Sequence, residues 1–463
     1  MQQYDLQNRW KLEGKWLQYY GLRNTPQLFR NRVRLTTAQR FIVSKLPCSL
    51  TAEELQTMKG FLGVQIVRVK EKKRTPTSLE EATFCKSCVA NDFMIPGIEF
   101  DDSGRCPICQ TKESTRNFKS IIPVKNTFPK SKKSRFDVAV FYTGGKDSTY
   151  LLYYLSKVCG LRVLACTWEI PYMSDSARAS IENAKKMLDQ VEFITRRVAN
   201  ADLKKIYQKL YSLNGNTCSC PSLAYVLFYP ELVGNKVPYF VAGNEPAQML
   251  GLYYNHMAPK IAYTFAECKG LQFLMNVGRV LTLHPPFKSG QFQTLATMKQ
   301  LAYRDNAIKN MMGYKNELLY NIGVAIKEVP NIVNPLKRAI RRSSWTGNIP
   351  AFVQVDLNDI CGVVYEWQKI KEVIVRECGW VAPPQTDKGL HTSCKIEKCK
   401  EYSQFIRFYS MQSTMIPFSA LEMAIASRHK NLSREDALKE IRSSLGFSLE
   451  EVPECAIMKE YLQ

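Results

Sequence analysis

The residues of this chain best suited to chemistry are the six from Thr143 to Ser148, whose sequence is TGGKDS. The adjacent glycines Gly144 and Gly145 have no Cβ atoms, so an anion can approach their backbone closely. Lys146 adds a positive charge beside them, Asp147 a carboxylate and Ser148 a hydroxyl group. Together these residue types predict a turn that binds phosphate.

The elements on either side of this turn support the prediction. Residues 136–142 (FDVAVFY) form an apolar, β-branched and aromatic run of strand length. Residues 149–160 predict a helix that ends at Gly160, and one of its faces carries Leu151, Leu152, Leu155 and Val158. A turn between a strand and a helix N-terminus directs several N–H groups and the positive end of the helix dipole at one spot. The plainest alternative is an ordinary Gly-Gly turn.

The spacing of the turn distinguishes between the known kinds of phosphate site. It has neither the four residues between glycines of the Walker pattern nor the third glycine of a dinucleotide fingerprint. It resembles the PP-loop (SGGKDS type) of the N-type ATP pyrophosphatases, with Thr143 in place of the usual serine. In this adenine nucleotide alpha hydrolase-like superfamily, ATP is cleaved between the α- and β-phosphates. AMP is attached to a substrate oxygen, and a nitrogen or sulfur nucleophile then displaces it.

The resemblance implies roles for the residues of the turn. Residues Thr143, Gly144, Gly145, Lys146, Asp147 and Ser148 would bind ATP. Lys146 and Asp147 would be catalytic, and the acid would be the ligand of Mg²⁺.

Four cysteines upstream of the turn form a second candidate site. Cys85 and Cys88 make one C-x2-C knuckle, Cys106 and Cys109 make another, and 17 residues separate the two. Four thiolates at this spacing suit a tetrahedral structural zinc, which leaves no open position for water. Gly104 supplies the tight turn that a knuckle needs. The alternative is four unrelated cysteines in a cysteine-rich chain.

The sequence around these knuckles narrows the resemblance. Residues 95–105 (IPGIEFDDSGR) between them resemble the N-terminal knuckle of the N-acetyl sugar amidotransferases of surface-polysaccharide synthesis, in which the knuckle precedes the PP-loop. The resemblance extends from Cys85 to Gly243 and returns at residues 428–438 (RHKNLSREDAL). It implies that Asn183 is a packing or nucleotide-proximal residue and that Gly243, followed by Asn244 and Glu245, ends a strand at the nucleotide site. The first 80 residues lie outside it, and residues 383–395 look more like PP-loop domains of peptide-synthetase and thioamide pathways.

The sequence leaves the nucleophile open between nitrogen and sulfur. In the favoured hypothesis ammonia displaces AMP, and a separate glutaminase supplies it because the chain shows no second catalytic module. The substrate would be a sugar or another small biosynthetic intermediate. In the alternative, a thioamide or thiolated base forms with sulfur from a donor protein. Cys218, Cys220 and Cys394 would then be catalytic, by holding an iron–sulfur cluster or a persulfide. Two further alternatives are a buried structural cysteine pair and a nucleotide-binding regulator without turnover.

The order of the expected elements predicts the fold. Strands at 162–168, 191–194 and 237–243 alternate with helices at about 176–189 and 202–211. The helix at 176–189 has an apolar face of Ala177, Ile181, Ala184 and Leu188. This alternation indicates an α/β fold with a doubly wound parallel sheet of the PP-loop (HUP-like) type, whose ligands bind at the carboxyl ends of the strands.

The chain divides into four expected regions. They are an N-terminal segment of unknown role at 1–80, the zinc-knuckle module at 81–125, the PP-loop domain at 126–290 and a mostly helical region at 291–463. In the first of these, Thr51 to Glu54 form a capping box that opens a helix ending near Gly60.

Composition restricts the environment and the partners. The net charge of +22 has dense basic clusters at Lys125–Arg135 and Lys337–Arg342. They fit either a nucleic acid such as tRNA or a basic linker and a solvated helix face; the second is favoured because no aromatic residues interleave a basic stretch. No run has the length of a membrane span and the first residues are polar, so we expect a cytoplasmic protein with no membrane partner. Fifteen cysteines then indicate metal sites or reactive thiols rather than disulfides.

Overall fold

The computed structural model describes residues 2–23, 32–70, 75–110, 128, 130–214, 222–244, 269–288, 290–303, 317–361, 365–384, 393–453 and 456–462. The chain divides into two compact units. The cysteine unit comprises residues 1–112, 401–428 and 433–452, and the sheet unit comprises residues 113–400, 429–432 and 453–463. The four-cysteine module therefore shares a unit with the N-terminal segment and with C-terminal helices, which sequence spacing alone does not indicate.

The sheet unit contains a parallel sheet of five strands within the described residues, in the Rossmann-like order β10–β9–β6–β7–β8. This confirms the predicted α/β class. In chain order the strands are β6 (Val138–Phe141), β7 (Val163–Trp168), β8 (Val191–Arg196), β9 (Tyr239–Asn244) and β10 (Ala351–Asp356). The four that the sequence predicts all form, each within three residues of its expected bounds.

The fifth strand, β10, is not among the predicted elements. It pairs with β9 along its whole length, from Ala351 beside Tyr239 to Asp356 beside Asn244. Its run AFVQVD is short and comes from a region that the sequence predicts to be mostly helical. A run of this length has no periodicity of its own that distinguishes a strand from a helix. Its partner strand decides its structure, and the sheet extends beyond residue 290.

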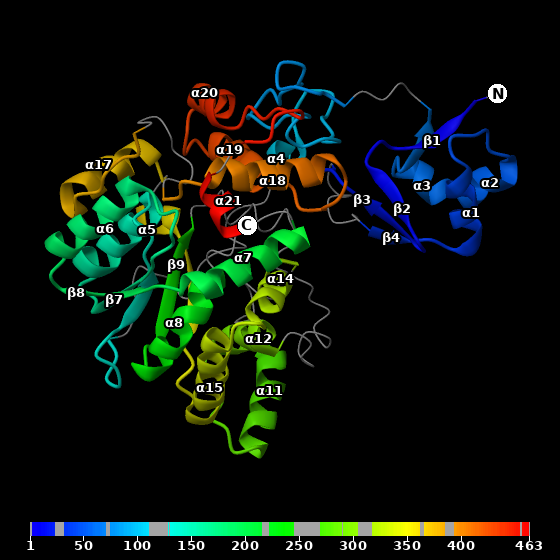
Figure 1. Ribbon diagram of the computed structural model, residues 1–463. Coiled ribbons are helices and arrows are strands. Elements are labelled where there is room, and N and C mark those ends of the chain that lie inside the picture. The colour runs from blue at the N-terminus through cyan, green and yellow to red at the C-terminus, as the bar shows by residue number, and fades with distance from the viewer. Residues whose placement is uncertain are drawn as a thin grey trace. The chain divides into compact units, whose positions relative to one another are not determined.

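Helices cover both faces of the sheet. The connections from β6 to β7 and from β7 to β8 step across the sheet in one direction and that from β8 to β9 in the other, so right-handed crossovers place helices on opposite faces. One face carries α5, α6 and the later helix α17, and the other carries α8 (Figure 1). The bounds are α5 (Lys146–Tyr153), α6 (Asp175–Met187), α7 (Asn200–Asn214), α8 (Ser222–Gly234) and α17 (Trp367–Cys378).

The predicted helical faces are largely confirmed, with one exception. Ala177, Ile181, Ala184 and Leu188 are all buried, as are Leu151, Leu152 and Leu155. Val158 is exposed instead of buried. The reason is a turn of π-helix over Tyr154–Val158, which rotates the last residues away from the face that α5 presents to the sheet.

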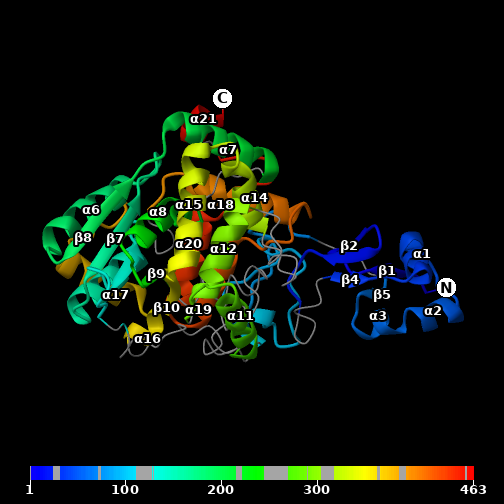
Figure 2. The ribbon, with the colours of Figure 1, turned by 90° about the horizontal axis from the view of Figure 1, so that it is seen from below.

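The remaining helices of the sheet unit confirm the predicted helical C-terminal region. α12, α14 and α15 pack against one another, and Figure 2 shows them side by side. Their bounds, with those of the other helices in this unit, are α11 (Lys269–Leu281), α12 (Gln291–Tyr303), α14 (Glu317–Ile326), α15 (Pro330–Thr346), α16 (Leu357–Cys361) and α21 (Ala456–Leu462).

The cysteine unit begins with two small antiparallel sheets, β1–β5 and β2–β3–β4. The predicted capping box is present, since Thr51 Oγ1 accepts from Glu54 N and the Glu54 carboxylate accepts from Thr51 N. Two short helices share the region that was predicted as one. The elements are β1 (Tyr4–Leu6), β2 (Trp10–Glu13), β3 (Trp16–Tyr19), β4 (Arg32–Arg34), α1 (Thr37–Lys45), α2 (Ala52–Thr57), α3 (Lys59–Gly63), β5 (Val67–Val69) and α4 (Pro107–Gln110).

C-terminal helices complete the cysteine unit. They are α18 (Glu397–Tyr409, which belongs to this unit from residue 401), α19 (Phe418–Arg428) and α20 (Arg434–Ser444). Phe405 of α18 packs on Phe93, with ring centroids 5.1 Å apart, and so joins the helices to the cysteine module. Among the described residues, no helix has both the length and the apolar character needed to cross a membrane.

Candidate functional site

The turn at Thr143–Ser148 lies at the carboxyl end of the central strand β6. The chain continues from β6 to β7 and β8 on one side of β6, and then crosses back to β9 on its other side. The direction in which successive strands are added therefore reverses between β6 and β9. Doubly wound sheets bind ligands at this point, outside the carboxyl ends of the strands. The fold therefore places the predicted turn where a ligand site of such a sheet is expected.

The backbone of the turn has the geometry that its two glycines predict. Gly144 has a φ of +73°, and a Cβ atom there would lie 2.4 Å from the carbonyl oxygen of Ala177. Gly145 is the N-cap of α5 and offers no side chain to cover the first turn of the helix. The hydroxyl groups of Thr143 and Ser148 lie 3.1 Å apart, and Gly145 N donates to Thr143 Oγ1. The first turn of α5 thus directs its N–H groups toward the end of the sheet.

The ammonium of Lys146 is held in an aromatic and acidic enclosure. Its side chain is almost fully buried, and Nζ donates to Asp147 Oδ1 and, at 3.3 Å, to Tyr365 Oη. The phenol of Tyr365 also donates to Asp147 Oδ1. Nζ lies 4.7 Å from the ring centroid of Tyr365 and 4.8 Å from that of Trp367. Both the lysine and the acid of the turn are therefore positioned by one aromatic segment.

This segment is the part of the site that sequence reasoning missed. Tyr365 stands 219 residues from Lys146, and Trp380 donates from Nε1 to Gly144 O at 3.1 Å across 236 residues. The only signal in the sequence is the density of aromatic residues around α17. Nothing in that signal names the lysine or the turn as the partner.

Two hydrogen bonds near the turn hold α6 and α17 in place. Tyr142 donates from Oη to Ser180 O at 3.2 Å, and burial raises the pKa of Tyr142 above its usual range. Asn183 donates from Nδ2 to Gly379 O at 2.8 Å, at the end of α17. The resemblance implies that Asn183 is either a packing residue or a residue near the nucleotide, and this contact fits the packing role.

The strand beside β6 places two further predicted residues at the same edge of the sheet. Val140 of β6 pairs with Val241 of β9, so Asn244 ends β9 at the same level as Thr143. Gly243 and Asn244 pair with Val355 and Asp356 of β10. The end of β9 thus adjoins the turn as predicted, and the next residue, Glu245, lies outside the described residues.

The cysteines of the sulfur hypothesis are described only in part. Cys218 and Cys220 lie outside the described residues, as does His391. Cys394 forms an antiparallel bridge with Met173, and Ser174 N donates to Ser393 O at 3.0 Å. Met173 belongs to the loop that follows β7. Cys394 therefore lies beside a loop at the carboxyl ends of the strands. Its convergence with Cys218 and Cys220 stays a prediction.

The four cysteines of the two knuckles form one cluster. All four sulfur atoms lie within 4.8 Å of one another, with 3.8 Å from Cys85 to Cys109 and 3.6 Å from Cys88 to Cys106. Zinc–sulfur bonds of about 2.3 Å at tetrahedral angles place sulfurs about 3.8 Å apart. The cluster is able to hold zinc or another metal ion of similar preference.

Local backbone groups support this cluster. Gly104 has a φ of +76° and its carbonyl accepts from Lys86 N, as the predicted tight turn requires. The Cys85 sulfur accepts from the N–H groups of Ser87 and Cys106. These contacts favour a thiolate, the form that binds metal.

A C-terminal arginine closes the first knuckle. Arg434, at the start of α20, donates from Nε to Cys88 O and from Nη2 to Cys85 O, each at 3.2 Å. It belongs to the run at 428–438, on which part of the resemblance seen in the sequence is based. Its two hydrogen bonds hold the start of α20 against the first knuckle.

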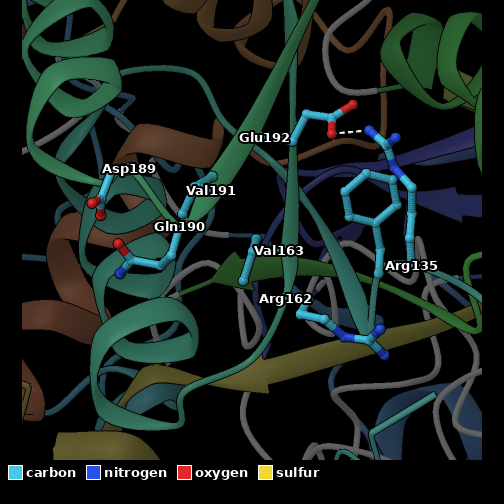
Figure 3. A pocket seen from close by; sticks show the side chains of 8 residues that line it. Arg135, Arg162, Val163, Asp189, Gln190, Val191 and Glu192 are labelled. Atoms are coloured by element: carbon cyan, nitrogen blue, oxygen red, sulfur yellow. Dashed lines mark hydrogen bonds and ion pairs between the residues drawn. The ribbon is translucent and has the colours of Figure 1, made fainter. Parts of the chain in front are cut away.

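A hollow at the amino ends of the strands is a weaker candidate for a ligand site than the turn. It encloses about 430 Å³ and is lined by residues at the amino ends of β6, β7 and β8, including Val163 and Val191 (Figure 3). Its two arginines are already paired, Arg135 with Glu192 and Arg162 with Asp137. Ligands of doubly wound sheets bind at the opposite ends of the strands.

A scan against models of known protein families finds no match for this chain, and neither does a search of curated proteins.

Proposed function

We propose that the protein is an ATP-dependent adenylating enzyme of the PP-loop type, which binds ATP at Thr143–Ser148. The observation that supports this best is the buried Lys146 at a glycine turn on the carboxyl end of the central strand, where the order of the sheet reverses. Burial of a lysine costs free energy unless an anionic ligand or partner compensates its charge. Here the carboxylate of Asp147, which also accepts a hydrogen bond from the phenol of Tyr365, is an anionic neighbour of the ammonium.

The residues of the turn have distinct roles in this proposal. N–H groups at the start of α5 and the charge of Lys146 bind the phosphates, which requires the ammonium to turn from Asp147 toward the nucleotide. Asp147 would hold Mg²⁺, which neutralises charge on the phosphates. Tyr365 holds both side chains in place until ATP arrives, and is a positioning residue.

The proposed reaction has two steps. A substrate oxygen attacks the α-phosphorus of ATP, and pyrophosphate leaves. Ammonia then attacks the carbon that bears the adenylated oxygen, the carbon–oxygen bond breaks and AMP leaves with the oxygen. The acceptor is a sugar or another small intermediate, and a separate glutaminase supplies the ammonia, as in N-acetyl sugar amidotransferases.

Sulfur is the second candidate nucleophile, and the position of Cys394 favours it. This residue is held at the carboxyl edge of the sheet by the loop after β7. A thiolate there, with Cys218 and Cys220, would deliver sulfur from a donor protein to the same adenylated carbon. An iron–sulfur cluster on the three cysteines belongs to this alternative.

The four-cysteine cluster takes a structural role in both versions. Its four ligands leave no position for water, so zinc there would hold the module together without acting on substrate. A nucleic-acid substrate such as tRNA is the less favoured acceptor.

The products of ATP turnover test the proposal directly. We expect the purified protein, supplied with extracts of small metabolites, to release AMP and pyrophosphate in equal amounts. Release of ADP and phosphate would refute the PP-loop assignment, and tight ATP binding without any turnover would favour the regulator. Product masses with ammonium and with sulfide then distinguish the nucleophiles.

A further inference from the structure

Helix α11 has its polar and apolar faces reversed relative to a helix of an ordinary soluble domain. Asn276 exchanges two hydrogen bonds with the backbone of Phe287, and Arg279 is buried against Pro285 and Ser344. The apolar side chains point outward instead. The exposed ones are Phe273, Leu274, Val277, Val280 and Leu281, the last 79% exposed.

The residue that ends this helix strengthens the observation. Leu283 has a φ of +59°, and His284 N donates to Arg279 O across the end of the helix. Glycine is the favoured residue at such a left-handed position, because a Cβ atom there costs free energy. Leu283 bears this cost and is 83% exposed, so its side chain makes no compensating packing contact.

A tryptophan and an arginine stripe on α15 adjoin this apolar end. Arg279 donates from Nη2 to Ser344 O at 2.9 Å, and the His284 ring stacks on Trp345 at 4.5 Å, so the two helices end together (Figure 1). Trp345 is 61% exposed. Arg338, Arg341 and Arg342 precede it at helical spacing, and all three are exposed.

The charge of this region has one sign. The sequence has no Asp or Glu between Glu267 and Asp305, and none between Glu328 and Asp356. These stretches contain α11, α12 and α15. A surface made of these helices therefore combines projecting apolar side chains, a tryptophan and arginines, with no carboxylate in either stretch.

We propose that this surface, formed by the outward sides of α11 and α15, binds an anionic lipid membrane peripherally. Leucine, valine and phenylalanine side chains enter the boundary between head groups and acyl chains, and Trp345 lies at the level of the head groups. Arg338, Arg341 and Arg342 bind the lipid phosphates. The sequence predicts no membrane partner because no run is long enough to span a membrane. Peripheral binding by a surface helix needs no such run, and the proposal departs from that prediction.

Lipid fits this surface better than RNA or a protein does. RNA would use the arginines but has no use for leucines and valines that project into solvent. A protein partner would be expected to bury Arg338, Arg341 and Arg342 against acidic groups at defined positions. A fluid anionic surface requires only the combination of charge and apolar side chains that is present.

Sedimentation of the full chain with vesicles tests the proposal. The wild type is expected to sediment with vesicles of phosphatidylcholine and phosphatidylglycerol, to bind pure phosphatidylcholine weakly and to be released by salt. Leu281→Asp with Leu283→Asp should weaken partitioning by about a hundredfold, the scale of exposing two leucines to water. Arg338→Gln, Arg341→Gln and Arg342→Gln together should have a similar effect. Phe41→Asp, at an exposed apolar residue on α1 outside this surface, is the control.

A single substitution separates binding from folding. Leu283→Gly relieves the left-handed backbone, so it should raise the melting temperature while it weakens vesicle binding. Quenching of Trp345 by brominated lipid, taken as the difference between wild type and Trp345→Phe, locates the surface in the wild-type protein. The proposal is overturned if the wild type stays in solution with anionic vesicles, if Leu283→Gly binds like wild type, or if the surface instead binds tRNA or a second copy of the chain.

Discussion

The cysteine cluster and the glycine turn at Thr143–Ser148 are built in opposite ways. The cluster takes its four ligands from residues 85–109 and its supporting hydrogen bonds mostly from the same stretch. The turn takes its backbone from six consecutive residues, but its lysine, acid and glycine are fixed by side chains more than 200 residues away. A cluster of this kind can be predicted from the spacing of its residues. A ligand site at a sheet edge depends on which distant segment the fold brings to it.

The largest expected effect is the loss of the metal from the cluster. Cys88→Ser should remove zinc and unfold the cysteine unit, because structural zinc contributes on the order of 10 kcal/mol in small zinc domains. Metal content by elemental analysis and thermal unfolding measure this. Cys159→Ser, at a cysteine outside the cluster, is the control. Equal melting of metal-free and metal-loaded protein would show that the cluster is not structural.

The next effect concerns the charge of the turn. Lys146→Ala should lower ATP turnover by about a hundredfold or more, since the phosphates lose their principal cation. Asp147→Asn should instead weaken the dependence of the rate on Mg²⁺. Initial rates against ATP and magnesium concentration distinguish the two. Lys185→Ala, at a lysine on α6 paired with Glu182, should leave the rate unchanged.

A pair of glycines tests the backbone of the turn. Gly144→Ala combines a φ of +73° with a clash at Ala177 O, and should destabilise the protein by about 3 kcal/mol and impair ATP binding. Gly160→Ala has a similar φ of +61° but open space around it, and should cost only about 1 kcal/mol. Denaturant unfolding measures both. Equal costs would mean that the contact with Ala177 does not matter.

The smallest effect distinguishes positioning from packing. Tyr365→Phe removes a hydroxyl that bonds both Lys146 and Asp147, and should change KM for ATP severalfold more than it changes kcat. Tyr229→Phe removes a buried hydroxyl bonded to Ser343 at 2.8 Å, far along the chain from the turn. Both should cost about 1 kcal/mol of stability. A Tyr365 variant that resembles the Tyr229 variant in its kinetics would show that the phenol only packs.

The errors of sequence reasoning have a common cause. The apolar face of α6 was predicted correctly because regular helical periodicity holds along its whole length. Val158 was predicted to lie on the apolar face but is exposed, because a π-turn changes the helical period. β10 was missed because six residues are too few to show a period. Each miss depends on hydrogen bonds or partners that lie outside the local pattern.

The sequence by itself determined the glycine turn, the four-cysteine cluster and the parallel α/β class. These follow from residue types at short spacing, since glycine conformations, thiolate geometry and strand–helix alternation are local properties. Only the tertiary structure decided that Tyr365, Trp367 and Trp380 enclose the turn, that Arg434 supports the cluster and that α11 turns its apolar side outward. Those contacts depend on the folding of distant segments onto one another, and residue spacing does not record which distant segments meet.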